Sequence, residues 1–206
     1  MKSSILGLFA VLLLAAAPAV RAEDGVRYIA QTEGSKMKIE GTSTIHDWTV
    51  ECGLLPGSME VTTDFDGDFK NLKTPPKVDV TIPVRQLKSG KKSMDAVMQD
   101  AMHMKEHAKI EYKLIEMTPN GPDGSKFKFD AKGSLTVSGV TRTNQMAIVM
   151  ERIDKTHIKV TGATSIKMTD HGIKPPAPDI GLGFIKTGDE VKISFEWMTA
   201  QAEAGT

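Results

Sequence analysis

Asp100, His103 and His107 are the side chains whose types and spacing come closest to a metal-binding or reactive set in this chain. At positions i, i+3 and i+7 of a helix, one carboxylate and two imidazoles could present three ligands to a zinc ion. A solvated helix face with two ordinary histidines accounts for the same spacing. The sequence favours this second interpretation and leaves a metal-responsive site as an alternative.

The segment 93–107 that carries these side chains also has an apolar stripe. The stripe recurs at i, i+3, i+4, i+7 and i+8, which is the spacing of one helix face, and consists of Met94, Val97, Met98, Ala101 and Met102. Because each helical residue advances about 100°, the histidines point nearly away from the methionines. This argues against a copper site that needs both ligand types together. The stripe predicts either an adaptable apolar lid over a cavity or a plain core helix.

Catalytic chemistry is not indicated by the sequence. No recognisable spacing brings a nucleophile and a general base together, and there is no phosphate-binding loop or nucleophile elbow. We therefore expect no enzyme activity and no cofactor. Cys52 is the single cysteine, which excludes an intramolecular disulfide. We interpret it as a small core or strand residue rather than as a reactive thiol.

The first 22 residues have the features of a secretory signal: Lys2, an apolar run over 5–17, and small residues at the end. Cleavage after Ala22 is preferred, and cleavage after Ala19 is the alternative. The apolar run is shorter than the roughly 20 residues that span a bilayer, so we expect no transmembrane segment. The sequence thus predicts a signal peptide over 1–22 and a single domain over 23–206, located in the periplasm or secreted.

The mature chain is almost electrically neutral. Without Lys2 and Arg21 it carries 24 basic and 26 acidic side chains, a net charge of −2. A chain of this kind has no basic surface for nucleic acid and no dense Lys/Arg block for anionic membranes. We therefore expect neither as a partner.

Apolar and polar residues alternate along the mature chain, which predicts strands with one wet and one apolar face. The alternation is clear over 78–84 and returns over 126–138, 156–168 and 190–199. There are up to ten such runs, some of which could merge, and only one short helix. The fold class is therefore all-β, with apolar faces that bury each other in a barrel or a sandwich.

Turn residues separate these runs. Asp66-Gly67, Pro119-Asn120-Gly121 with Asp123-Gly124, and Ser138-Gly139 all have the composition of hairpin turns. The segment 170–188 contains three prolines and several glycines, so it cannot be a central strand. We expect it to be a long loop that covers one end of a barrel.

Six segments of the chain, taken in order, resemble the YceI-like family, which is associated with lipids and polyisoprenoids. They are GTSTIHDWTVE at 41–51, VTIPVRQLKSGKKSMD at 80–95, KIEYKL at 109–114, KGSLTVSGVTR at 132–142, DHGIKPP at 170–176 and GDEVKISFE at 188–196. The resemblance implies an extended, lipocalin-like antiparallel β-barrel of about eight strands, exported to the periplasm, that holds a long apolar ligand and has no catalytic residues. The chain departs from the family just after the expected helix, where Met102, His103, Met104 and His107 stand in place of aromatic and acidic residues.

Strand alternation and the helix stripe together predict which side chains face the ligand. The predicted cavity residues are Val80, Ile82, Met94, Met98, Met102, Tyr112, Leu114, Phe127, Phe129, Leu135, Ile193, Phe195 and Trp197. The expected partner is an isoprenoid or another amphiphilic lipid, with a homodimer as an alternative to a monomer. The sequence leaves open whether the barrel is hollow. An envelope stress or interaction module with a packed barrel is the alternative function.

Overall fold

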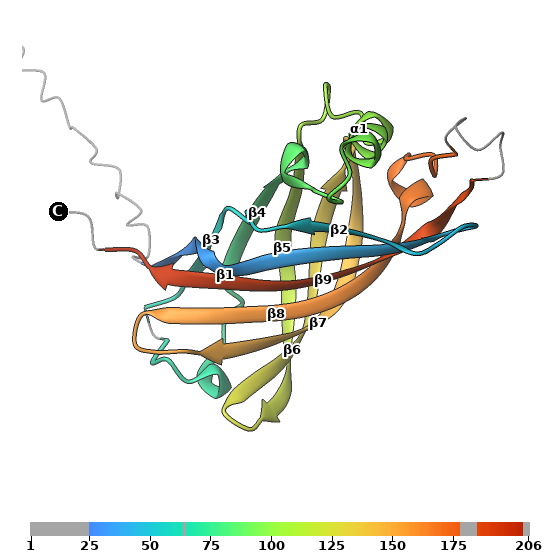
Figure 1. The fold of residues 1–206 in the computed structure, drawn as a ribbon. Helices are drawn as coiled ribbons and strands as arrows, with labels where there is room; N and C mark the ends of the chain where they lie inside the picture. Colours follow the sequence, from blue (N-terminus) through green and yellow to red (C-terminus); the bar gives the residue numbers. More distant parts are fainter. Residues whose placement is uncertain (1–24, 64, 178–184, 204–206) are drawn as a thin grey trace, which may run out of the picture.

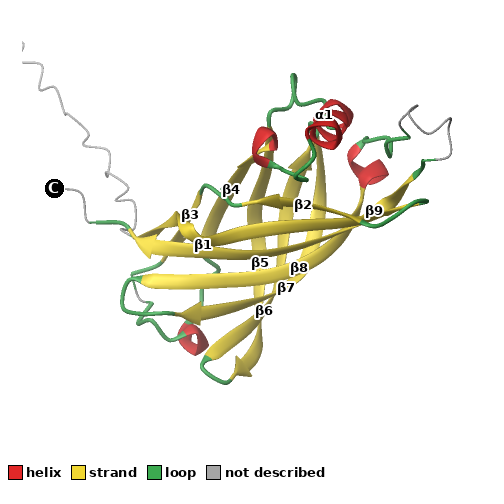
Figure 2. Cartoon of the chain, viewed as in Figure 1, coloured by secondary structure: helices red, strands yellow, loops and turns green. Residues whose placement is uncertain are grey.

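The computed structural model describes residues 25–63, 65–177 and 185–203 (Figure 1). Strands make up most of this part of the chain, and helices are confined to a few connections (Figure 2). The strands are β1 (Val26–Ser43), β2 (Trp48–Cys52), β3 (Gly57–Val61), β4 (Lys77–Pro83), β5 (Lys109–Asp123), β6 (Lys126–Val137), β7 (Val140–Arg152), β8 (His157–Lys167) and β9 (Thr187–Gln201). The α-helix is α1 (Lys92–Ala101), and the 3₁₀-helices are η1 (Phe69–Asn71), η2 (Val84–Gln86) and η3 (Met168–His171).

The predicted signal peptide and both of its cleavage positions lie outside the described residues. Among the helices that are described, none is long and apolar enough to cross a membrane.

The strands form one antiparallel sheet that closes on itself. Neighbours pair in the order β2-β1-β3-β4-β5-β6-β7-β8-β9, and β9 also pairs with β1. The long strand β1 is forked along one edge, because residues 26–29 pair with β3 whereas residues 37–41 pair with β2. Its other edge pairs with β9. The ring therefore contains eight strands, and β2 is an extra strand outside it. The predicted all-β barrel of about eight strands with one short helix is confirmed.

The predicted turns have different outcomes. Ser138-Gly139 joins β6 to β7 as a two-residue turn, with φ of 49° and 77°, as expected for a type I′ hairpin. Pro119-Asn120-Gly121 does not turn the chain. It lies at a register shift inside β5, because pairing with β6 continues as far as Asp123. Asp66-Gly67 is not a hairpin tip either, since it lies in the 62–76 connection that carries η1.

An aromatic cluster includes Phe69 of η1, and η1 lies at the end of the barrel opposite α1 (Figure 1). The ring of Phe69 meets Phe129 edge to face at a centroid distance of 6.5 Å and stacks on Phe65 at 5.5 Å. Phe127 lies 5.0 Å from Phe129. Phe127 and Phe129 were both predicted to line a ligand cavity. They instead belong to this cluster, because the chain between β3 and β4 packs Phe69 against Phe129, which in turn contacts Phe127.

A charged triad links β1, β8 and β9, next to the β1–β9 pairing that closes the barrel. The Oε1 atom of Glu196 on β9 lies 2.7 Å from Nζ of Lys36 on β1, and Oε2 lies 2.5 Å from Nζ of Lys159 on β8. Hydrogen bonds from Lys159 and then Lys36 lower the pKa of the Glu196 carboxyl to about 2. The Glu196 side chain is 31% exposed, so solvent screens much of this interaction.

Glu196→Gln is expected to change how stability depends on pH. A carboxyl whose pKa is lowered in the folded state stabilises the fold above its unfolded pKa, here 4.5, and that contribution is lost as the pH falls toward 2. The variant should be about 1 kcal/mol less stable than the wild type at pH 6, and the difference should shrink near pH 2. Urea unfolding at several pH values measures it. A difference that stays constant down to pH 2 would contradict this account of the triad.

Candidate functional site

The barrel encloses a cavity of about 500 Å³ beneath α1. The interior is therefore not fully packed, which weighs against the alternative of a solid barrel. Every predicted cavity residue except Phe127 and Phe129 lies on its wall: Val80, Ile82, Met94, Met98, Met102, Tyr112, Leu114, Leu135, Ile193, Phe195 and Trp197. The strand residues among them face inward as the alternation rule predicts, since successive side chains of a strand point to opposite faces.

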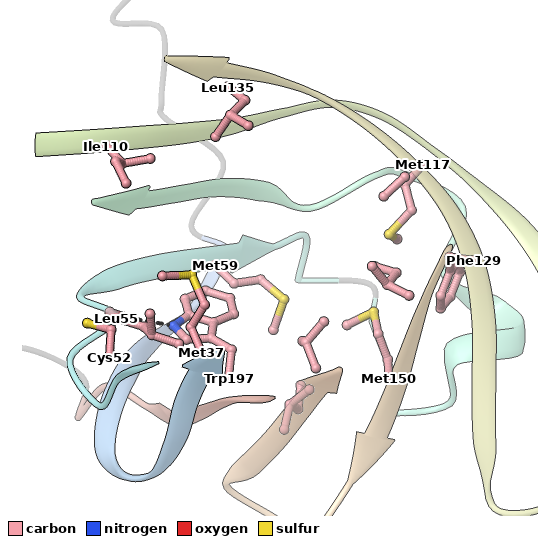
Figure 3. Close-up of a cluster of buried hydrophobic side chains, with 14 of the residues drawn as sticks. Met37, Cys52, Leu55, Met59, Ile110, Met117, Phe129, Leu135, Met150 and Trp197 are labelled. Carbon is pink, nitrogen blue, oxygen red and sulfur yellow. Dashed lines mark hydrogen bonds between the residues drawn. The ribbon is translucent and has the colours of Figure 1, made fainter. Parts of the chain in front are cut away.

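Methionine is the commonest residue type on the wall. Nine of the 12 methionines in the chain line the cavity, namely Met37, Met59, Met94, Met98, Met102, Met117, Met146, Met150 and Met168. Figure 3 shows Met59, Met117 and Met150 extending from different strands into the interior. Unbranched thioether side chains change shape at small energetic cost. The wall can therefore adapt to guests of different outline.

Trp197 is a fixed part of this wall. Its side chain is 4% exposed, and its indole Nε1–H donates a 2.9 Å hydrogen bond to the carbonyl of Leu55, drawn as a dashed line in Figure 3. Cys52 lies nearby and is also buried. Its thiol donates to the carbonyl of Leu54 at 3.2 Å, and burial raises its pKa. Cys52 is thus a core strand residue, as predicted, and not an activated nucleophile.

The inner face of β7 was not included among the predicted cavity residues. Asn144, Met146, Ile148 and Met150 point inward from this strand and line the cavity. Their spacing is the same two-residue alternation that identifies the other walls, so the signal was present in the sequence. On β1, Met37 and Ile39 were missed in the same way.

Helix α1 forms part of the roof. Its whole apolar stripe faces the cavity: Met94, Val97, Met98, Ala101 and Met102. Asp95 anchors the start of the helix, because its Oδ1 accepts hydrogen bonds of 2.7 Å from both the backbone N–H and the hydroxyl of Ser89. These bonds lower the pKa of Asp95. A negative charge in the first turn also complements the helix dipole.

The prediction that His103 and His107 lie on a helix face is wrong. The helix ends at Ala101, and His103 adopts the left-handed conformation with φ of 50°. Its Nδ1 then lies 2.9 Å from the hydroxyl of Ser138, and the His107 ring packs against Gly139. Both histidines therefore fasten the end of the helix to the β6–β7 turn. Within the described residues, no three side chains, these with Asp100 included, form a group that could hold a metal ion.

The segment that follows β8 covers another part of this end of the barrel. His171, at the end of η3, is 2% exposed and lines the cavity together with Ile173 and Pro176. The described part of the predicted 170–188 loop thus covers the barrel end, as expected. Residues 178–184 of that loop lie outside the described residues.

Polar side chains are few on the wall. In the described part of the chain it contains no carboxylate, and its one charged side chain is the exposed Lys91 at the edge of α1. Tyr112 lies over Gly133, with its hydroxyl 2.5 Å from the place where a Cβ at position 133 would be. Only a glycine leaves room for the ring there. Burial raises the pKa of the Tyr112 phenol to about 12.

Tyr112→Phe is expected to remove the latest step of an alkaline titration. Because the folded pKa of Tyr112 is raised, ionisation of the unfolded chain destabilises the wild-type fold progressively between pH 10 and about 12. The variant should lose the tyrosinate absorbance that develops near pH 12, and its stability should fall less steeply above pH 10. Absorbance at alkaline pH and unfolding at matched pH values measure both effects. Loss of absorbance near pH 10 instead, with the same pH dependence of stability as the wild type, would show that Tyr112 is solvated.

Comparison with known proteins agrees with this geometry. A family model described as the YceI-like domain matches residues 28–198. The chain belongs to the YceI-like family. The sequence resemblance found above is therefore confirmed over most of the chain. No curated protein matches it.

Solved structures show the same YceI-like fold at low sequence identity. A polyisoprenoid-binding domain from Saccharophagus degradans, implicated in plant cell wall breakdown, is 14% identical with a TM-score of 0.66, over 86% of this chain and 99% of that one. BcnA from Burkholderia cenocepacia is 16% identical with a TM-score of 0.66, over 82% and 98%. A mutant YCEI protein of Campylobacter jejuni with a monobromobimane guest is 19% identical with a TM-score of 0.56, over 75% and 85%.

Proposed function

We propose that this YceI-like protein binds an isoprenoid or another long apolar lipid inside its barrel, without catalysis. The observation that carries the proposal is the methionine-rich cavity of about 500 Å³. Its size falls within the range of small-molecule sites, which are mostly apolar clefts with a few polar groups. The Saccharophagus domain with the same fold is described as binding a polyisoprenoid, and this supports a ligand of the same class.

Burial of the lipid chain would supply the affinity. Each methylene moved from water into the cavity contributes about 0.8 kcal/mol, so a long chain gains more than a short one. The adaptable methionine wall lets the cavity close around chains of different shape. The outer barrel face carries the charged pairs that keep the complex in water, such as Lys126 with Glu151 on β6 and β7.

Helix α1 would act as the lid. It presents its apolar stripe to the cavity, with Ser93 of its first turn at the edge, and none of its own residues is fully buried. Its ends are held by two small polar contacts, Asp95 with Ser89 and His103 with Ser138. A helix held in this way can move without disturbing the strand pairing of the ring. We also assign the chain to the periplasm or the extracellular space, on the strength of the signal features in residues 1–22.

Organic extraction tests the proposal. Protein purified from its native compartment should release a long-chain lipid in about one-to-one proportion, identified by mass spectrometry. Protein stripped of lipid should take up a long-chain polyprenyl or quinone probe in vitro. The proposal is wrong if no lipid is extracted in stoichiometric amount and no probe is taken up.

A further inference from the structure

Among the polar side chains on the mostly apolar wall, two are buried. His171 comes from η3 at the roofed end and is 2% exposed, and Asn144 comes from the inner face of β7 and is 9% exposed. Both line the cavity. A polar group costs free energy when it is buried without a partner. The polar atoms of these two side chains that have no partner therefore indicate which ligand groups the cavity can bind.

The tautomer of neutral His171 is set by the backbone. Its Nδ1 lies 3.0 Å from the carbonyl oxygen of Val140. A carbonyl oxygen only accepts, so Nδ1 carries the proton and donates it. The neutral ring then has a lone pair on Nε2, which can only accept a hydrogen bond. Within the described residues, Nε2 makes no hydrogen bond.

Asn144 also offers an acceptor. The hydroxyl of Thr164 donates its proton to the carbonyl of Gln145 at 3.3 Å, so its oxygen accepts the amide N–H of Asn144 at 3.1 Å. This arrangement fixes the amide and leaves Oδ1 of Asn144 buried with no partner in the described structure. Met146 is the next inward side chain on the same strand, and an unbranched methionine can shift to let a ligand reach that oxygen.

We propose that the cavity selects lipids with an uncharged hydrogen-bond donor, such as the hydroxyl of a long-chain alcohol. The inference rests on the proposed function and narrows its ligand class. The donor of the head group meets Nε2 of His171 or Oδ1 of Asn144, while the chain fills the methionine-lined space. A hydrocarbon or an ether brings no donor and leaves both acceptors unpaired. A carboxylate or a phosphate brings negative charge to two acceptors, and the described part of the wall has no buried lysine or arginine to balance it.

Two probes that differ by one methyl group test the selection. Geranylgeraniol carries a hydroxyl donor, whereas geranylgeranyl methyl ether has the same chain and only an acceptor oxygen. Their affinities are measured by displacement of a fluorescent apolar reporter from the lipid-free full-length mature protein. We expect the alcohol to bind roughly tenfold more tightly than the ether, which corresponds to one buried hydrogen bond.

Two variants locate the effect. His171→Phe keeps an aromatic ring of similar size and removes Nε2, and Asn144→Leu keeps the branched shape of the side chain and removes Oδ1. At least one of them should bring the two affinities together by weakening alcohol binding, with ether binding changed by no more than about twofold. Gln145→Leu is the matched control, because its exposed side chain lies on the outer face of the same strand. The control should keep the preference for the alcohol.

The possible outcomes distinguish a failure of this inference from a failure of the proposed function. If the wild type binds both probes equally well, the donor selection is wrong and lipid binding stands. If the preference survives in both folded variants, another group reads the hydroxyl and the assignment to His171 and Asn144 is wrong. If His171→Phe fails to fold after losing its bond to Val140, Asn144→Leu and the wild-type comparison still decide the question. If neither probe nor any other lipid binds, the proposed function fails as well.

Discussion

Met98→Asp is expected to abolish lipid uptake and to leave the barrel folded. Met98 faces the cavity from the middle of α1. A carboxylate at this position either loses its water inside an apolar space, at a cost of several kcal/mol, or swings the helix away and leaves the cavity unroofed. Either result weakens lipid binding by at least about a hundredfold. Reporter displacement measures the binding, and circular dichroism measures the fold.

Ala96→Asp is the matched control for this experiment. Ala96 is exposed on the same helix, so the same charge is added in water and should leave uptake unchanged. Loss of the β-sheet signal in Met98→Asp would show that α1 is part of the core and not a lid. Normal uptake by a folded Met98→Asp protein would show that the ligand does not pass or contact this helix.

Phe129→Ala is expected to cause a large loss of stability. Its ring is 1% exposed and contacts both Phe69 and Phe127 in the aromatic cluster at the η1 end of the barrel. Removal of a fully buried aromatic ring loses its transfer free energy and leaves a cavity, which together cost about 3–5 kcal/mol. The free energy of unfolding in urea should fall by this amount.

Ile115→Ala provides the comparison on an exposed position. The Ile115 side chain on β5 is 58% exposed, so its truncation should change stability by less than about 0.5 kcal/mol. A loss below about 1 kcal/mol for Phe129→Ala would mean that the aromatic cluster contributes little and that the strand ring alone holds this end together.

The strands and their inward faces could be predicted because one rule governs both. A strand that is half buried must alternate, and its period of two names the inward residues directly. Val80, Ile82 and Leu135 follow from this rule alone. The same rule names Asn144 and Met146 on β7, where it was not applied to the cavity. The alternation in the sequence therefore indicates more of the cavity wall than the predicted residues include.

The parts that failed depend on contacts between distant segments. Phe127 and Phe129 alternate like cavity residues, but only the three-dimensional path of the chain between β3 and β4 decides that Phe69 packs on Phe129, which in turn contacts Phe127. The helix stops at Ala101 because His103 turns into the left-handed region and meets Ser138. The two residues are 35 positions apart in the sequence, so no local pattern predicts their contact.

The fork in β1 separates two sets of strand hydrogen bonds: those within the ring of eight strands, and those that hold β2 outside it. The ring of eight strands is paired on both edges, whereas β2 is paired with β1 on one edge and with Lys88 through the single bridge at Glu51 on the other. Lys88 leads directly into the segment that anchors α1. The roof is thus attached to the least supported strand.

Hydrogen exchange should therefore distinguish two classes of backbone amides by the free energy of the opening through which they exchange. Amides between β5, β6 and β7 should exchange only on global unfolding, whereas those of β2 and α1 should exchange through a smaller opening of lower free energy. A guest could then come and go many times within the lifetime of one folded barrel.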